Sequence, residues 1–208
     1  MSGDDVASEP PTAQRPAARR PDRRLQQLGG AAAVAAGGVT ALAGLPADVP
    51  GWLGVAGSLV GALLLPVAAV LLVKAFVGDR APLGWAKLGG IMLIIYSCWW
   101  LVLLALPLVL SPGPSAMVVT SGSEVVRIVV GLAAAAAIAA RWPVRGFNRW
   151  SMLVVVAGDI VSTQLAWLAA PAGSVPLMLA MGLAWPLSVV ALGIGHALSG
   201  RRRLGEGA

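Results

Sequence analysis

Cysteine, histidine and charged side chains are all scarce in this chain of 208 residues. The one cysteine, Cys98, excludes an internal disulfide framework and any metal site built from several cysteines. The one histidine, His196, excludes the two- and three-histidine constellations of zinc and di-iron chemistry. We therefore expect neither a metal ion nor another cofactor.

Charged residues make up 12% of the chain, about half the fraction of an ordinary soluble domain. Hydrophobic residues make up 58%, and the mean hydropathy is +0.83. Such a composition leaves too little polar surface to coat a soluble globule. A net charge of +6 can suggest a nucleic-acid partner, but the apolar content argues against one. The composition predicts an integral membrane protein whose main partner is the lipid bilayer.

Six uncharged runs follow a polar, proline-rich start, and each has about the 20 residues that a membrane-spanning helix needs. They cover residues 25–47, 49–73, 88–110, 121–141, 150–170 and 174–198. The fourth run is expected to begin near Ser121, because residues 121–124 have the spacing of a helix capping box. The sequence therefore predicts an all-α bundle of six transmembrane helices over residues 25–198. Residues 1–24 are expected to form a disordered basic tail, and residues 199–208 a short basic one.

The basic residues indicate how this bundle is oriented, since lysine and arginine stay preferentially on the cytoplasmic side. Fourteen of the fifteen lie in the segments 1–24, 74–87, 141–149 and 199–208, and Arg127 is the exception. This distribution predicts a protein of the plasma (cytoplasmic) membrane with both termini in the cytoplasm. One alternative stays open, because Arg23-Arg24 and the mild run that follows resemble a twin-arginine signal. Its cleavage would leave five helices.

Asp159 is the residue that most suggests a function. It lies near the middle of the fifth run, and an ionisable group at that depth costs at least a few kcal/mol unless it faces protein or water. Ser162 and Thr163 follow at helical spacing and share its face. This polar stripe predicts a solute or ion pathway, or else a buried carboxylate that fixes helix packing.

Arg127 has two candidate partners. Glu124 lies three residues earlier on the same helix, whereas Asp159 is about 7 Å away in depth on the next one. We expect the Glu124 pair, because a helix that begins near Ser121 places Arg127 close to the lipid headgroups. A permanent ion pair with Asp159 would argue against a proton-carrying role for that carboxylate.

Four aromatic residues lie near the middle of their runs: Tyr96, Trp99, Trp100 and Trp185. An indole-lined pocket with one carboxylate would suit an organic cation, and apolar filling between helices is the alternative. The other tryptophans lie near run ends and are expected to be interfacial anchors, namely Trp52, Trp85, Trp142, Trp150 and Trp167. His196 is expected to be an unremarkable interfacial residue, about 15 Å in depth from Asp159.

Small residues recur at four-residue spacing in the first two runs and predict close helix packing: Gly29, Ala33, Gly37, Ala41, Gly57 and Gly61.

The function that these features favour is a small-solute transporter, or the membrane subunit of one, with Asp159 on its pathway. Two alternatives remain: an accessory or assembly subunit of a larger complex or homo-oligomer, and a membrane-embedded enzyme acting on a lipid or isoprenoid. A single carboxylate provides few groups for catalysis, so the enzyme is the least favoured of the three functions.

Overall fold

The computed structural model describes residues 21–44, 51–78, 84–111, 113–144, 146–172 and 175–202. Within these ranges the chain is helical and has no strand, which confirms the all-α prediction. The six helices are α1 (Arg23–Ala43), α2 (Gly51–Phe76), α3 (Trp85–Val109), α4 (Pro114–Arg141), α5 (Phe147–Ala172) and α6 (Val175–Arg202). The rest of the predicted tails, residues 1–20 and 203–208, lies outside the described residues.

Within the described residues, four helices are long and apolar enough to cross a membrane. They are Trp52–Phe76, Trp85–Leu106, Pro114–Arg141 and Gly182–Ser199. The apolar helices thus indicate a membrane protein, while the six-span topology and the side on which the termini lie stay predictions.

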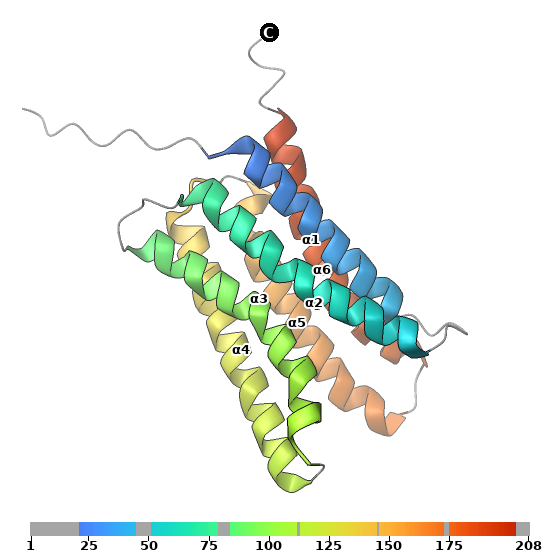
Figure 1. The fold of residues 1–208 in the computed structure, drawn as a ribbon. Coiled ribbons are helices and arrows are strands. Elements are labelled where there is room, and N and C mark those ends of the chain that lie inside the picture. Colours follow the sequence, from blue (N-terminus) through green and yellow to red (C-terminus); the bar gives the residue numbers. More distant parts are fainter. Residues whose placement is uncertain are drawn as a thin grey trace, which may run out of the picture.

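The contacts between helices form a closed ring, and Figure 1 shows this bundle from its side. Each helix packs against its neighbours in the chain, and α1 packs against α6 to close the circle. Among the described residues, no helix backbone packs against the one across the ring. Side chains that point inward from different helices therefore meet along one central axis. We call the end where α1 begins and α6 ends the terminal end of the ring.

The outward faces of the ring are apolar. On α2, for example, Leu59, Leu63, Val67 and Val70 follow each other at helical spacing and are all exposed. A continuous apolar stripe of this kind is typical of a surface that meets lipid or another protein.

Small residues allow the helices to approach closely where α1 meets its neighbours, as predicted. A Cβ atom on Gly37 would lie 2.6 Å from the carbonyl oxygen of Pro186 on α6. On α2, a Cβ atom on Gly61 would collide with the Thr40 hydroxyl of α1. At the terminal end, the Ser199 hydroxyl accepts hydrogen bonds from Gln26 of α1 (2.5 Å) and Asn148 of α5 (2.8 Å).

The prediction that the fourth helix begins near Ser121 is wrong, because α4 begins seven residues earlier, at Pro114. Proline is well suited to a first helical turn, since its missing N–H would have no partner there. The hydroxyls of Thr120 and Ser123 donate to the carbonyl oxygens of Ala116 and Thr120 inside the helix, each at 2.8 Å. The segment with capping-box spacing is therefore helix interior, and Arg127 lies at the middle of α4.

Candidate functional site

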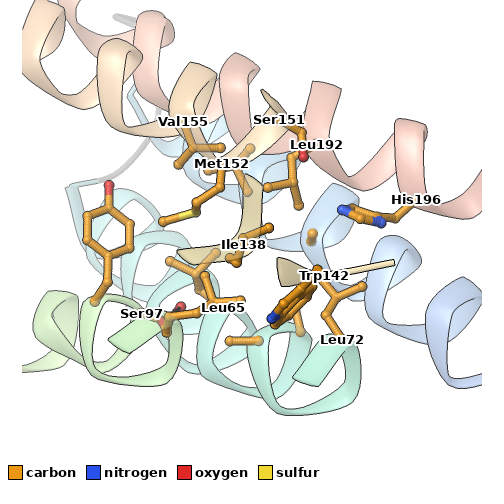
Figure 2. A pocket seen from close by; sticks show the side chains of 16 residues that line it. Leu65, Leu72, Ser97, Ile138, Trp142, Ser151, Met152, Val155, Leu192 and His196 are labelled. Atoms are coloured by element: carbon orange, nitrogen blue, oxygen red, sulfur yellow. Dashed lines mark hydrogen bonds between the residues drawn. The ribbon is translucent and has the colours of Figure 1, made fainter. Parts of the chain in front are cut away.

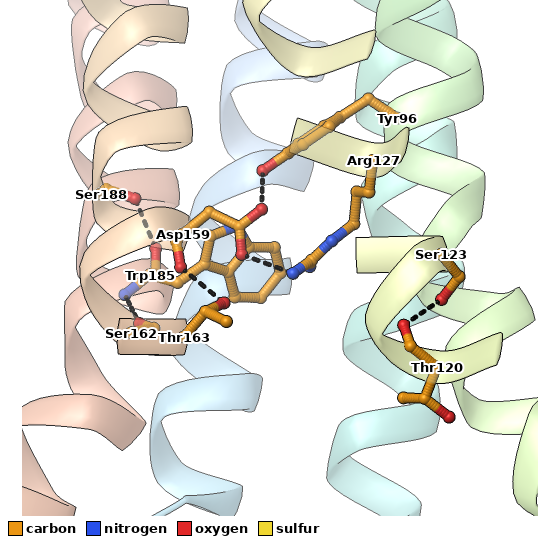
Figure 3. A network of polar contacts seen from close by, with 9 residues as sticks. All are labelled: Tyr96, Thr120, Ser123, Arg127, Asp159, Ser162, Thr163, Trp185 and Ser188. Carbon is orange, nitrogen blue, oxygen red and sulfur yellow. Dashed lines mark hydrogen bonds and ion pairs between the residues drawn. The ribbon is translucent and has the colours of Figure 1, made fainter. Parts of the chain in front are cut away.

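An ion pair between two helices lies at the centre of the ring. The Nη2 atom of Arg127 on α4 is 2.9 Å from Oδ1 of Asp159 on α5, and each side chain is 2% exposed (Figure 3). Both residues lie near the middle of their helices, far from either end of the bundle. Arg127 thus pairs with Asp159, the alternative partner, and not with Glu124, which the sequence favoured. The reason is that α4 begins at Pro114, well before the expected start, so that Arg127 lies at mid-helix. Glu124 itself is half-buried.

The second oxygen of the carboxylate is also engaged. The Tyr96 hydroxyl of α3 donates a 2.8 Å hydrogen bond to Oδ2 of Asp159, across the ring axis. Tyr96 is almost fully buried. Asp159 therefore connects three helices, and both its oxygens have a partner (Figure 3).

Two indoles are stacked beside the ion pair. The guanidinium carbon of Arg127 lies 4.7 Å from the centroid of the Trp100 ring, a distance typical of a cation–π contact. Trp100 in turn lies 4.3 Å from Trp185 of α6, with an angle of 37° between the rings. We call Tyr96, Trp100, Arg127, Asp159 and Trp185 the central layer.

Hydroxyl groups next to the central layer link it to the backbone of α5 and α6. The Ser162 hydroxyl accepts a 3.1 Å hydrogen bond from the backbone N–H of Trp185. Thr163 donates to the carbonyl oxygen of Asp159 (3.0 Å), and Ser188 donates to that of Trp185 (2.6 Å). Ser162 therefore joins the two helices that carry Asp159 and Trp185.

Among the four predicted aromatic residues, Trp99 is the one to which no role can be assigned. Its side chain is half-buried, and its indole nitrogen is buried without a hydrogen-bond partner. Tyr96, Trp100 and Trp185 are brought together with Asp159, whereas Trp99 makes no hydrogen bond or ring contact with them among the described residues.

Several nitrogens at this depth are buried with no hydrogen-bond partner. They are Nε and Nη1 of Arg127 and the indole nitrogens of Trp99, Trp100 and Trp185. All of them are donors, because guanidinium and indole nitrogens carry hydrogens and accept nothing. The described part of the central layer thus has a surplus of donors over acceptors.

A cavity of about 40 Å³ lies on the ring axis between the central layer and the terminal end (Figure 2). Every helix contributes to its wall, for example Ala33 of α1, Leu65 of α2, Ser97 of α3, Ile138 of α4 and Val155 of α5. Tyr96 lines it as well, so the cavity reaches the hydroxyl-bearing ring that contacts Asp159. Its volume is enough for about three water molecules.

An aromatic cluster borders the cavity towards the terminal end. The ring of Phe76 lies 5.1 Å from that of Trp142 and 5.5 Å from that of His196. Trp142 and His196 both line the cavity, as Figure 2 shows, and Nδ1 of His196 is buried without a partner. We call Phe76, Trp142 and His196 the terminal aromatic cluster.

The terminal aromatic cluster corrects two expectations. Trp142 is not an exposed anchor but is 6% exposed, and its indole N–H donates to the carbonyl oxygen of Ala86 (3.1 Å). His196 is buried on the axis rather than at the lipid interface. Nothing in the sequence indicated directly that Trp142 and His196 are buried, because only the closure of the helices into a ring turns these two side chains inward. By contrast, Trp52, Trp85 and Trp150 are exposed, in keeping with anchoring, and the Trp167 side chain lies outside the described set.

On the other side of the central layer, α3 and α4 carry little packing. Between Leu101 and Leu110, and between Pro114 and Val126, each described side chain is exposed or half-buried. Thr120, Ser123 and Glu124 lie one to two turns from Arg127 in this part of α4 (Figure 3 shows the first two). Within the described residues, α3 and α4 are therefore tightly packed on the terminal side of Arg127 and loosely packed on the far side.

Comparison with known proteins identifies no relative: no protein-family model, curated protein or solved structure matches this chain. Among the described residues, no three His, Cys, Asp or Glu side chains come together as a metal site would require. The site must be interpreted from its own chemistry.

Proposed function

We propose that this protein spans the cytoplasmic membrane six times, with both termini inside, and moves a small solute along the axis of its helix ring. The observation that carries this proposal is the axial cavity, because all six helices line it and it abuts the central layer at Tyr96. Binding sites between the helices of a bundle are a common arrangement for small molecules. Polar residues at mid-membrane depth commonly mark substrate or ion pathways.

The central layer is the proposed point of solute recognition. Arg127 and Asp159 compensate each other, so the layer carries two strong polar groups without a net charge in a region of low dielectric. This pairing argues against Asp159 as a carrier of protons by itself. It favours direct contact between a solute and the guanidinium or the neighbouring indoles.

The two ends of the axis differ in a way that supports alternating access. The terminal aromatic cluster closes the cavity on one side, whereas the far side of Arg127 is bordered by the loosely packed halves of α3 and α4. A solute would reach the central layer from the far side. It would leave when the packing of Phe76 against Trp142 and His196 opens.

The proposal is tested by uptake and efflux in proteoliposomes with a broad panel of small solutes. Wild type should transport at least one solute, and Asp159→Asn should abolish that transport. The double variant Arg127→Gln/Asp159→Asn removes both charges together, so it should fold like wild type and still be inactive. Glu124→Gln, one turn away on α4, serves as the control that keeps transport. The proposal is contradicted if the wild-type protein transports no solute of the panel, or if the double variant is fully active.

A second function, an accessory subunit of a larger membrane complex, is supported by the sparse packing of the far halves of α3 and α4. Leu108, Val109 and Val118 are exposed there. Purification in mild detergent followed by mass spectrometry separates the two: a stoichiometric partner protein favours the subunit, and a lone monomer or homodimer counts against it.

A further inference from the structure

The donors of the central layer outnumber its acceptors. Arg127 uses one of its three guanidinium nitrogens on Asp159, and its Nε and Nη1 have no partner. The indole nitrogens of Trp100 and Trp185 are buried without partners as well. Trp185 is 5% exposed and Arg127 is 2% exposed, so bulk water does not satisfy these groups.

Each oxygen of the Asp159 carboxylate already has one protein donor. Oδ1 of Asp159 accepts from Arg127, and Oδ2 accepts from Tyr96. The Ser162 hydroxyl accepts from the backbone of Trp185. A ligand that brings acceptor atoms of its own would satisfy the remaining donors, and an unmet buried donor is unfavourable.

We propose that the solute carries a carboxylate, and that this carboxylate accepts hydrogen bonds from Arg127 together with the indole N–H groups of Trp100 and Trp185. This inference rests on the proposed function, and it names the substrate class of the same site. A guanidinium is well matched to a carboxylate, because its planar donors fit two carboxylate oxygens. The Trp100 ring contacts both Arg127 and Trp185, so the three donor-bearing side chains lie next to one another.

This class differs from the organic cation that the aromatic pocket first suggested. The only carboxylate of the central layer, Asp159, already has its countercharge in Arg127. One face of Trp100 is covered by the guanidinium, and the ring also stacks on Trp185. A cation would leave the buried donors unmet, whereas a carboxylate accepts hydrogen bonds from them.

The test is ligand binding to the purified full chain in nanodiscs, measured as a shift of the thermal midpoint and by calorimetry. The panel contains sodium salts of small monocarboxylates, zwitterionic amino acids, chloride, phosphate and choline, all at equal ionic strength. Wild type should bind a carboxylate-bearing member and should not bind choline. Arg127→Lys keeps the charge but removes the planar donors, and it should weaken binding at least about ten-fold.

The sharpest variants are Trp100→Phe and Trp185→Phe, which keep an aromatic ring in the stack and remove the N–H donor. Each should weaken carboxylate binding about five-fold, the effect of one ordinary hydrogen bond. Trp150→Phe is the matched control, because Trp150 is exposed on α5, and it should leave the affinity unchanged. A structural role of the indoles would lower the thermal midpoint without ligand, which the same melts report.

The outcomes separate the two proposals. The inference is overturned if no carboxylate binds, or if neither Trp100→Phe nor Trp185→Phe changes the affinity for the carboxylate. Transport of choline or of chloride that depends on Arg127 also overturns it, while the proposed function stands. Carboxylate binding without transport of any kind supports the site and contradicts the proposed function.

Discussion

The Arg127–Asp159 ion pair makes a quantitative prediction about stability. Neutralising one partner, by Asp159→Asn or Arg127→Gln, leaves the other charge buried at the centre of the ring with no countercharge. Neutralising both at once leaves two amides that can bond to each other. We therefore expect each single variant to be much less stable than the double variant.

The magnitude follows from the geometry. At the observed 2.9 Å between Nη2 and Oδ1, two unit charges attract by about 6 kcal/mol at an effective dielectric constant of about 20. Loss of one partner of a buried pair typically costs about 3–5 kcal/mol, because the remaining charge keeps its desolvation penalty. Removing both charges abolishes the attraction and the penalty together. The double variant should thus be at least about 3 kcal/mol more stable than the sum of the two single changes implies.

The assay is reversible unfolding of the purified protein in mixed micelles by added sodium dodecyl sulfate, followed by far-ultraviolet circular dichroism. Wild type, the two single variants and the double variant form one thermodynamic cycle. Glu124→Gln is the control for the local pair that the sequence favoured. It should change the free energy of unfolding by less than about 0.5 kcal/mol.

Two results would refute the reasoning. If the two single changes add up in the double variant, the charges do not interact. If Glu124→Gln destabilises the protein as much as Asp159→Asn, Arg127 is held by its own helix rather than by α5.

Three further predictions concern the same fold. Tyr96→Phe removes the 2.8 Å hydrogen bond to a charged oxygen and should cost about 1.5–3 kcal/mol in the same unfolding assay; an unchanged stability would contradict that bond. Gly30→Ala would place a Cβ atom 2.7 Å from backbone atoms of α6 and should destabilise by about 1–3 kcal/mol. Gly38→Ala, which meets nothing within 4 Å, should be neutral or stabilising, and equal effects of the two would argue against the α1–α6 contact. In a cysteine-free background, Ser111→Cys should react with a membrane-impermeant maleimide from outside intact cells and Gly84→Cys should not; the opposite pattern would reverse the proposed orientation.

The helices themselves were predictable, because long apolar runs are a direct consequence of the bilayer's thickness. The start of α4 was not. Ser121 to Glu124 have the residue types of a helix cap, but nothing in the local sequence says whether their hydroxyls bond outward or back to the helix. The proline at 114, on the first helical turn, was the better signal.

That one boundary determined the assignment of Arg127's partner. A helix that starts near Ser121 leaves Arg127 close to its end, where a local pair with Glu124 is the simpler choice. With seven more residues at the start, Arg127 lies at mid-helix and reaches Asp159. Asp159, Tyr96 and Trp185 were predicted as site residues only from their position near the middle of their apolar runs. The structure places these three together.

The terminal aromatic cluster could not be predicted, for a geometric reason. Which side of a uniformly apolar helix faces inward depends on the helices beside it, and α2, α3 and α6 are apolar on most of their circumference. Phe76, Trp142 and His196 face the axis because the six helices close into a ring. Closure is a property of the whole bundle, so no local pattern reports it.

Ring closure also sets an order of events during synthesis. The contact that completes the circle joins α1 to α6, which leave the ribosome first and last among the described helices. The glycine face of α1, with Gly30 and Gly37, therefore stays uncovered until Gly193 and Pro186 of α6 arrive. Arg127 likewise enters before its countercharge, because α4 is made before α5. For this protein, insertion of the helices and assembly of the site are separate steps, and the second can be completed only when the last helix is in place.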